Sequence, residues 1–581
     1  MNTFLKNILS SAIGVLLAGF ILIGSFIMLI IVSSFIAIFN QGDKIEKNSV
    51  VKMEFNYPIS DKPNTDPFMN FSPLGDFEPN NSKHLYQILK GINIAASNDN
   101  VAGIVLDLTS FQSPGQASIK EIRDALRIFK ESGKFIYAYA NIFGKSAYYL
   151  ASVSDSIFMY PTGGMELSGL STTTPFFTET LEEIGIKPEI IRHGKFKAAI
   201  EPFMLTEMSK ENRQQTEMLL NDLWTDMLKD ISVTRNLSVH IINAIADNII
   251  ISMLPEEPVK NGLIDGLIYP DAFNTLIANK INIEDSDEIN FISIDELKNK
   301  KNKSKNKIAI IYAEGDINGD EKNIHSGYTK ILKKVLNDDA INAVVFRVNS
   351  RGGSALISDE ILSQIKLSKK EKPLVVSMGN YAASGGYYIS CAADKIIASP
   401  NTITGSIGVF GLIFTAEKLL TEKMKLHFDN VKTNTFSDMG ELHRDISKAE
   451  KKSLQISVKN IYNDFITHVA NGRNMNIEDV DNIGQGRVWT GIRAKEIGLV
   501  DELGGLVDAI QIASDLAEIK DFKIEEFPKK GNGIEEFLKT IEETKKISTK
   551  SIHQIYLDEI KKEFLKMQGV QALLPTKYEL N

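Results

Sequence analysis

Short apolar runs alternate along most of the chain with longer stretches in which apolar residues recur at helical spacing. Runs such as 104–106, 343–345 and 373–378 are rich in Val, Ile and Leu and predict buried strands. The stretch 387–393, which follows the third run, predicts the first turns of a helix. Strands that alternate with helices favour an α/β fold with crossover connections.

The N-terminal apolar segment is much longer than these strands. Residues 8–39 contain no charged residue and are mostly Leu, Ile, Val, Phe, Ala and Gly, whereas about 20 apolar residues are enough to span a bilayer. No small-residue cleavage site follows, so the pattern predicts an uncleaved transmembrane anchor within residues 1–42 rather than a signal peptide. Because lysines flank the segment on both sides, the positive-inside rule does not set its orientation.

The chain also repeats its own pattern. The segment 141–150 (NIFGKSAYYL) resembles 380–389 (NYAASGGYYI) at an offset of 239 residues, and Gly262–Asp265 resembles Gly498–Asp501 at an offset of 236. Each half has the same order of predicted elements: strand, helix, strand, helix, short strands and a longer helical stretch. Such self-similarity predicts a tandem duplication of one α/β domain.

The predicted boundaries follow from composition. A first repeat over 43–296 and a second over 308–527 flank residues 297–307, which are mostly Lys, Asn and Ser and predict an exposed linker. Residues 528–581 are predicted to be a helical tail, because apolar residues recur at helical spacing among many Lys and Glu from 533 to 567. A chain of 581 residues is too long for a single core.

The net charge and the cysteine content exclude several kinds of partner and site. The formal net charge of −9 argues against nucleic acid as the main partner. The single cysteine, Cys391, excludes an intrachain disulfide and a thiolate metal cluster. The eight histidines show no metal-ligand spacing, so no metal and no cofactor is expected.

Ser384 is the strongest candidate for chemistry. It lies in the run 380–388, between a predicted strand and a predicted helix, and the small residues around it leave room for a second backbone. A hydroxyl at such a junction lies near the positive end of a helix dipole. A tight turn that serves only packing is equally compatible with this local run.

The two repeats differ at this position. Ser384 corresponds to Lys145 in the first repeat, which therefore has no hydroxyl there. The first repeat instead carries two lysines within Gly194–Ala199, and Lys197 corresponds to Phe436 in the second repeat. A composite site, to which one repeat gives a serine and the other a lysine, explains this divergence.

A serine hydroxyl needs a base beside it at neutral pH. No histidine carries a motif in either repeat, although His193 lies close to Lys197 in the sequence. A buried lysine can serve instead, since burial lowers its pKa, and Ser–Lys pairs are an accepted variant of the catalytic triad. Glycines within 349–354 offer backbone amides to an oxyanion, and the hydroxyl of Ser406 could hold the lysine amine in line.

Three motifs in this order resemble those of the S49 serine peptidase family, which includes signal peptide peptidases. They are Asn-Ser-x-Gly-Gly-Ser at 349–354, Ala-Ala-Ser-Gly-Gly-Tyr-Tyr at 382–388 and Thr-Gly-Ser-Ile-Gly at 404–408. The run Gly-Lys-Phe-Lys-x-Ala-x-Glu-Pro-Phe at 194–203 resembles the matching segment of the long, duplicated form. The resemblance covers nearly the whole chain, and it implies tandem ClpP/crotonase-like domains behind an N-terminal transmembrane helix.

The resemblance also implies a site and a function. The residues that it assigns are Ser384 as nucleophile, Lys197 as general base, Ser406 as the residue that orients the lysine, and Gly353 and Gly352 as oxyanion donors. Lys197 is preferred to Lys195 because the family's base directly precedes small residues. Arg351 departs from the family, which usually has proline there.

The expected activity is that of a serine endopeptidase that degrades cleaved signal peptides and other apolar peptides through an acyl-enzyme. The resemblance implies a homotetramer tethered by residues 8–39 to a bacterial inner membrane, with its catalytic part in the periplasm. Two alternatives stay open on the sequence: a crotonase-like acyl-CoA enzyme, which would not need a Ser–Lys pair, and a membrane scaffold whose site has decayed.

Overall fold

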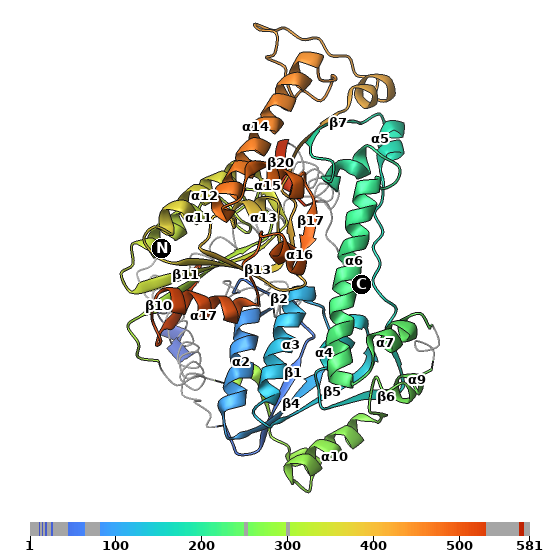
Figure 1. Cartoon of the computed structure of the whole chain (residues 1–581), viewed down its shortest axis with the longest axis vertical. Helices are drawn as coiled ribbons and strands as arrows, with labels where there is room; N and C mark the ends of the chain where they lie inside the picture. The colour runs from blue at the N-terminus through green and yellow to red at the C-terminus, as the bar shows by residue number, and fades with distance from the viewer. Residues whose placement is uncertain are drawn as a thin grey trace.

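A computed structural model describes residues 45–63, 82–248, 254–297, 302–529 and 569–574, with a few helical positions between 11 and 26. Most of the predicted anchor, residues 8–39, lies outside this part of the chain. Among the residues that the structure does describe, no helix is long and apolar enough to cross a membrane. The described chain forms two α/β domains, drawn in blue to green and in yellow to orange in Figure 1.

The domain of the first repeat is built on a six-stranded sheet in which all neighbouring strands are parallel. In spatial order its strands are β8 (Gly266–Leu267), β6 (Ser156–Met165), β5 (Phe135–Phe143), β4 (Val101–Asp107), β1 (Ser49–Glu54) and β9 (Phe291–Ser293). The predicted strand at 104–106 is the centre of β4. A separate short pair joins β2 (Ile59–Ser60) to β3 (Lys83–His84).

Helices cover both faces of this sheet. The helices of the first repeat include α2 (Leu85–Ser97), α3 (Gln116–Lys130), α4 (Lys145–Ala151), α5 (Thr178–Ile184), α6 (Lys210–Arg235), α7 (Val239–Ala246), α9 (Glu257–Lys260) and α10 (Pro270–Ile281). Apolar residues of α2, α3, α4, α6 and α7 share one core with the sheet, and those of α10 pack on the other face. Burial on both faces explains the continuous apolar runs of the parallel strands.

The domain of the second repeat has an eight-stranded sheet. Its main path is β17 (Val488–Thr490), β15 (Ile403–Gly405), β13 (Leu374–Ala383), β11 (Ile341–Ser350), β10 (Lys307–Glu314) and β19 (Lys523–Phe527), while β14 (Lys395–Ala398) pairs with β13 and with β18 (Glu502–Leu503). The pair β15–β17 is antiparallel and the other pairs are parallel. The strands predicted at 343–345 and 373–378 lie in β11 and β13.

Helices also cover both faces of the sheet in the second domain. Its helices include α11 (Tyr328–Leu336), α12 (Ala355–Ser368), α13 (Gly385–Tyr388), α14 (Lys448–Arg473), α15 (Ile477–Ile483), α16 (Gly491–Glu496) and α17 (Leu506–Leu516). Residues of α11, α12, α13 and α14 share the larger core, and α17 packs on the opposite face of the sheet. The helices α6 and α14 each contain 26 residues and hold corresponding positions in the two repeats.

Equivalent hydrogen bonds confirm the internal duplication. The hydroxyl of Tyr148 donates to the carbonyl of Leu263 at 2.9 Å, and in the second domain Tyr387 donates to Leu499 at the same distance. These residues belong to the segments that the sequence offsets pair. Residues that the sequence offset pairs therefore hold equivalent positions in the two domains.

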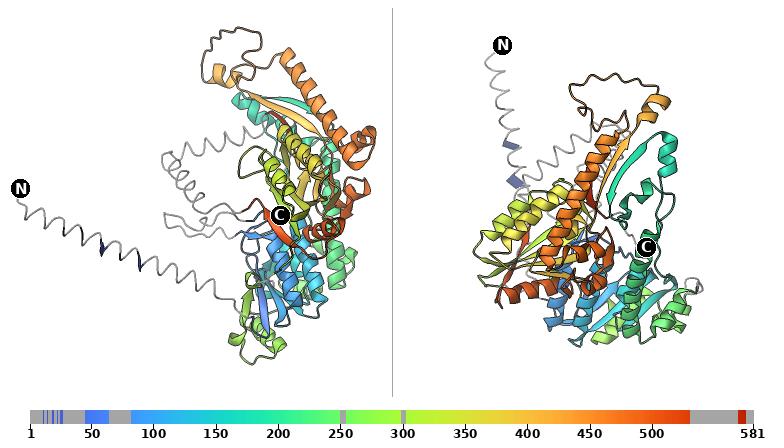
Figure 2. Two further views of the ribbon diagram at one scale, coloured as in Figure 1. Left: turned by 90° about the vertical axis from the view of Figure 1, so that its left-hand side faces the viewer. Right: turned by 45° about the horizontal axis from the view of Figure 1, so that its top comes forward.

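A third sheet joins the two repeats. Its strand order is β12 (Gly352–Ser354), β20 (Gly569–Leu573), β16 (Val409–Thr415) and β7 (Lys187–His193), and every pair is antiparallel. Strand β7 comes from the first repeat and pairs along its whole length with β16 of the second, beside α14 (Figure 2). This exchange carries the chain that follows β7 into the second domain.

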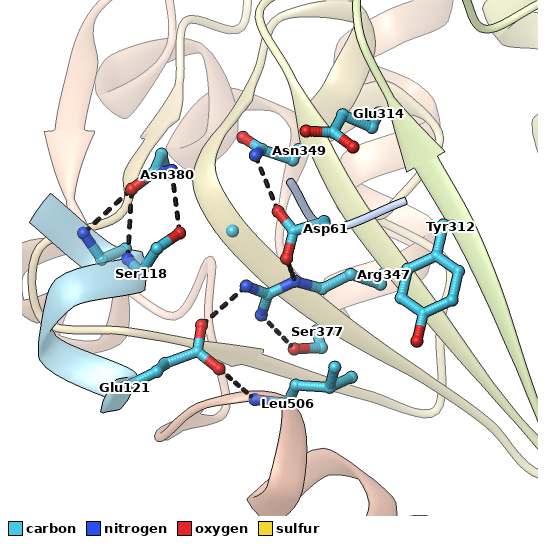
Figure 3. A network of polar contacts seen from close by, with 12 residues as sticks. Asp61, Ser118, Glu121, Tyr312, Glu314, Arg347, Asn349, Ser377, Asn380 and Leu506 are labelled. Atoms are coloured by element: carbon cyan, nitrogen blue, oxygen red, sulfur yellow. Dashed lines mark hydrogen bonds and ion pairs between the residues drawn. The ribbon is translucent and has the colours of Figure 1, made fainter. Parts of the chain in front are cut away.

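A buried polar network also fixes the two domains to each other (Figure 3). The guanidinium of Arg347, on β11, is fully buried and bonds Asp61 at 2.8 Å and Glu121 of α3 at 2.6 Å. Glu121 also accepts the backbone amide of Leu506 at 2.7 Å. These buried bonds connect β11 of the second domain with Asp61 and α3 of the first.

Two elements differ from the sequence-based prediction. The helix after Ser384 spans Gly385–Tyr388 rather than 387–393, because the chain must turn back to let Asp394 bond the start of β13. In the predicted helical tail, residues 569–573 form strand β20, because the edges of β12 and β16 supply partners for an extended chain. The helical pair predicted at 533–567 and the centre of the linker, 298–301, lie outside the described residues.

Candidate active site

Ser384 lies at a sharp junction between a strand and a helix. It directly follows β13 and precedes α13, with backbone angles φ +55° and ψ −113°. Such angles cost free energy in a residue other than glycine, and they cluster at functional sites. The amide of Ser384 donates to the carbonyl of Gly405 at 2.8 Å, and the side chain is fully buried.

Lys197 meets this serine within one chain. Its Nζ lies 2.7 Å from Ser384 Oγ, 3.0 Å from Ser406 Oγ and 3.2 Å from the carbonyl oxygen of Ser406. The lysine is fully buried, and no carboxylate is among its hydrogen-bond partners in the described residues. Burial therefore holds the pKa of its ammonium group well below the ordinary value of 10.5.

The loop that carries Lys197 is held against the second domain by backbone contacts. The amide of Phe196 donates to the carbonyl of Gln485 at 3.0 Å. A Cβ atom on Gly486 would lie 2.6 Å from Lys197 Cβ and 2.7 Å from its Cα, so only glycine allows this approach. Gly194 is similarly close to Gln485 and has φ +98°. These contacts fix the position of the Lys197 backbone.

Two polar side chains of the first repeat support the same loop. Gln215, on α6, donates to the carbonyl of Phe196 at 3.1 Å and accepts the amide of Val488 at 3.3 Å. The carboxylate of Glu201 is fully buried and accepts bonds from Ser209 and Asn212 at the start of α6. Sequence reasoning did not single out these residues, although a glutamate inside the run 194–203 was a usable signal.

The two other candidate bases lie apart from the serine. Lys195 is exposed, and its amine lies over the ring of Phe196 at 5.6 Å. His193 is half-buried and its ring faces that of Tyr462, with 4.1 Å between centroids; burial lowers the pKa of the imidazole. Among the three, only Lys197 is recorded in contact with Ser384.

The glycine loop after β11 borders the same site. Gly352 has φ +102° and Gly353 has φ +148°. The amide of Gly352 donates to Ser350 Oγ at 3.1 Å. Of the two predicted oxyanion donors, Gly353 is therefore the one whose amide does not make this bond. Arg351 holds the loop through Asp316, with Nη2 3.0 Å from Oδ2, and this ion pair accommodates the residue that replaces the expected proline.

A further amide, which sequence reasoning missed, belongs to Gly385. A Cβ atom built on Gly352 would lie 2.6 Å from this nitrogen and 2.1 Å from the carbonyl oxygen of Ala572 in β20. Gly353 is the register partner of Ala572, so Gly353 and Gly385 both lie close to that residue, beside Ser384. Paired backbone amides of this kind stabilise the oxyanion in acyl transfer.

Comparison with known proteins gives the family. The model of "Peptidase family S49" matches residues 128–284 and 366–520, more than half of the chain. Protease 4 of Salmonella typhi is 34% identical over 487 residues, which are 80% of this chain and 78% of that protein. The chain belongs to peptidase family S49. As a member of it, the chain is a serine peptidase with two S49 domains.

A further relative of this S49 peptidase matches over a similar share of the chain. The chloroplastic serine protease SPPA of Arabidopsis thaliana is 30% identical over 82% of this chain and 70% of that protein. Among solved structures, ClpP1 from Listeria monocytogenes aligns at 16% identity and a TM-score of 0.22, over 34% of this chain and 92% of that one.

The duplicated S49 match divides the site between the repeats. Lys197 lies in the first matched segment, and Ser384 and Ser406 lie in the second. At the positions that correspond by sequence offset, Lys145 pairs with Glu166 at 3.2 Å and Phe436 is exposed. Within the described chain, neither domain of this S49 peptidase repeats the serine–lysine contact by itself.

Proposed function

We propose that this S49 peptidase cleaves apolar peptides, including signal peptides released by preprotein processing, with Ser384 as nucleophile and Lys197 as general base. The observation that carries the proposal is the 2.7 Å contact between the buried amine and the serine hydroxyl. A lysine whose ammonium pKa is lowered by burial has a larger neutral fraction at working pH and can accept the proton.

The hydrogen bonds of the amine suit this role. A neutral amine has two N–H bonds and one lone pair. If the N–H bonds point to the carbonyl and hydroxyl oxygens of Ser406, at 3.2 and 3.0 Å, the lone pair is left for the hydroxyl of Ser384. Ser406 therefore acts as the residue that orients the lysine, as the carboxylate does for histidine in a Ser-His-Asp triad.

In the proposed reaction Lys197 takes the proton of Ser384 while Oγ attacks the substrate carbonyl carbon. The amides of Gly353 and Gly385 donate to the oxyanion. The ammonium of Lys197 then protonates the departing amine, which leaves an acyl ester on Ser384. Water hydrolyses the ester with the lysine again as base, and the free serine is restored.

We also propose where the reaction takes place. The uncharged segment 8–39 supports a single-pass membrane anchor. A bacterial inner membrane, with the catalytic domains in the periplasm, is what the sequence resemblance implies. A membrane-tethered homotetramer with ClpP/crotonase-like domains stays a prediction from the sequence resemblance. Apolar peptides suit a site at a membrane, because signal peptides carry an apolar core.

The test compares purified full-length proteins on a fluorogenic apolar peptide. Ser384→Ala and Lys197→Arg are each expected to lower kcat/KM by at least about 10³-fold, since removal of a catalytic nucleophile or base commonly costs this much. Arginine keeps the positive charge but does not deprotonate. Lys195→Arg is the matched control and should keep the wild-type rate, because Lys195 is exposed and apart from Ser384.

A fluorophosphonate probe should label the wild type at Ser384 and leave the Ser384→Ala chain unlabelled. Wild-type turnover by Ser384→Ala would disprove the nucleophile. If Lys197→Arg kept its activity while Lys195→Arg lost it, the base would be Lys195.

A further inference from the structure

Strand β13 is irregular just before the proposed nucleophile. Val348 of β11 pairs with Met378 of β13. The next pair joins Ser350 to Ala382. One residue of β11 therefore faces three residues of β13, 379–381, which form a bulge. Bulges are common beside active sites, where they redirect the strand and the side chains that follow.

The bulge is also the point at which β13 changes one of its partners. Before the bulge β13 pairs with β14, and after it with β15, up to the pair Ala383–Gly405. Ser384 and Ser406 directly follow these two residues. Both serines contact the amine of Lys197. The path of the bulge therefore sets where the two hydroxyls lie.

Asn380, the middle residue of the bulge, makes four hydrogen bonds to the first domain (Figure 3). Its Oδ1 accepts the amides of Ala117 and Ser118 at 3.0 and 3.2 Å. Its Nδ2 donates to the carbonyl of Pro114 at 2.8 Å and to Ser118 Oγ at 3.0 Å. All four partners lie at the start of α3. The bulge of the strand that carries the serine is thus bound to a helix of the other repeat.

Helix α3 has no capping side chain of its own. Its N-cap residue is Gly115, whereas the first amides of a helix need an acceptor from outside the helix. Asparagine is among the side chains that are favoured in this role. Asn380 therefore caps α3 from the second domain. The fit is close, because a Cβ atom on Gly115 would lie 2.5 Å from Cγ and Oδ1 of Asn380.

A second amide side chain binds the bulge to the first domain. Asn349, which lies opposite the bulge on β11, accepts the amide of Tyr381 on Oδ1 at 3.2 Å. Its Nδ2 donates to Oδ2 of Asp61 at 2.7 Å. The first domain thus holds the bulge at two places, the start of α3 and Asp61.

The corresponding positions of the two repeats differ here as well. At the offset of 239 residues Asn380 corresponds to Asn141, which is exposed, whereas Asn380 is half-buried. Helix α12, which corresponds to α3, is capped by its own Ser354. A cap supplied by the other domain is therefore a feature of the pair formed by Asn380 and α3, and the general pattern of the repeat does not account for it.

We infer that Asn380 is a positioning residue for the peptidase reaction: by capping α3 it holds the bulge so that Ser384 Oγ stays within hydrogen-bond distance of Lys197. The inference rests on the proposed function. The first domain then contributes to the site twice, through the lysine itself and through the helix that fixes the strand of the serine. Loss of the cap frees the bulge and moves Ser384, while Lys197 keeps its own support from Gly486.

The experiment compares purified full-length variants on the fluorogenic peptide. Asn380→Ala is expected to lower kcat and kcat/KM equally, by about 10²-fold, a typical cost of misplacing a catalytic group by about 1 Å. Asn380→Asp should recover most of this loss, since a carboxylate also accepts the amides of α3 and is favoured at a helix N-terminus. Asn141→Ala is the matched control and should keep the wild-type rate, because Asn141 is exposed.

The pH profile separates a displaced serine from an altered lysine. In Asn380→Ala the rising limb of kcat/KM should stay at the wild-type pH, because Lys197 keeps its burial and therefore its lowered pKa. Fluorophosphonate labelling of Ser384 should slow by the same factor as kcat. A limb that moves toward pH 10.5 would show that Asn380 acts on the lysine and would overturn the inference.

A second variant perturbs Asn380 from the first domain and covers the case in which Asn380→Ala does not fold. In Gly115→Ala the new methyl group would displace the Asn380 amide, so kcat should again fall, whereas Gly133→Ala, with a similar positive φ and no neighbour within 4 Å, should stay near wild type. If Gly115 acts through Asn380, the double variant with Asn380→Ala should be no slower than Asn380→Ala alone. Equal rates of Gly115→Ala and Gly133→Ala would contradict the inference.

Ser384→Ala, measured in parallel, distinguishes this inference from the proposed function. If Ser384→Ala loses turnover while a folded Asn380→Ala keeps the wild-type kcat, the positioning role is wrong and the proposed function stands. If Ser384→Ala itself keeps the wild-type turnover, both are wrong. Circular dichroism and Tm of each variant establish that it is folded at the assay temperature.

Discussion

At the scale of single residues, burial gives Lys197 its properties. A lysine on the surface is protonated at neutral pH, and a protonated amine has no lone pair for a serine proton. The chain removes the amine from water and offers it only hydroxyl and carbonyl oxygens, without a carboxylate that would favour the charged form. The nearby Lys195, which is exposed, lacks these conditions.

A pH dependence of the rate follows from this burial. In the proposed function the neutral amine is the active form, so kcat/KM should rise with pH through the lowered pKa of Lys197 and fall in acid, with the rising limb well below pH 10.5. The measurement is kcat/KM of the fluorogenic peptide from about pH 5 to about pH 10. The rate of fluorophosphonate labelling of Ser384 should follow the same curve. A rate that stays flat through acidic and neutral pH, or rises only near pH 10.5, would contradict a buried lysine base.

At the scale of elements, the site depends on an exchange between the repeats. Strand β7 of the first repeat pairs with β16 of the second, and the loop after it is pressed against Gln485 and Gly486. The position of the lysine is thus set by backbone packing of one domain on the other. Small displacements of a catalytic group are costly, because the hydrogen bond to Ser384 requires a narrow range of distance and angle.

Gly486→Ala tests this packing. The new methyl group would meet the backbone of Lys197 at 2.7 Å, so we expect kcat/KM to fall by about 10²-fold, a typical cost of misplacing a catalytic group by about 1 Å. Gly133→Ala is the matched control: its φ of +79° is close to the +83° of Gly486, but nothing lies within 4 Å of the new Cβ. Both variants should lose stability through backbone strain. Equal activities of the two variants would contradict the role of the contact.

At the scale of the whole molecule, buried charges join the domains. Arg347 binds Asp61 and Glu121 across the interface, and Glu314 lies beside them, where it accepts the amide of Lys62 at 2.7 Å (Figure 3). Burial, together with the charge of Asp61, raises the pKa of Glu314 from 4.5 to about 7. The folded protein therefore keeps a proton on Glu314 at pH values at which the unfolded chain has released it.

This proton makes stability depend on pH. Between pH 4.5 and about 7 the folded state binds more protons at Glu314 than the unfolded state, so its contribution to the free energy of unfolding falls as pH rises. We expect Glu314→Gln to raise Tm relative to wild type more at about pH 8 than at about pH 5, as measured by calorimetry. The exposed Glu131→Gln serves as control and should show no such trend. An equal difference at both pH values for Glu314→Gln would contradict the raised pKa.

Much of the architecture and of the site could be predicted from the sequence by itself. Buried parallel strands must be apolar on both faces, so β4, β11 and β13 are visible as continuous runs, and duplication leaves matched letters at a fixed offset. Divergence at Ser384 and Lys197 pointed to one shared site, because each repeat kept a polar residue that the other lacks. The end of the helix after Ser384 and the secondary structure of the tail were harder to predict, because contacts with distant segments determine both.

Only the tertiary structure decided which groups touch. The sequence resemblance already preferred Lys197 to Lys195, but only the structure shows that Lys197 is buried and Lys195 is exposed. The role of Gly486 depends on a backbone contact between segments far apart in the chain. Residues 569–573 became a strand because two open strand edges supply hydrogen bonds that no local sequence pattern contains. Local sequence sets the propensity of each segment, but contacts between distant segments set the burial, strand pairing and hydrogen bonding on which this site depends.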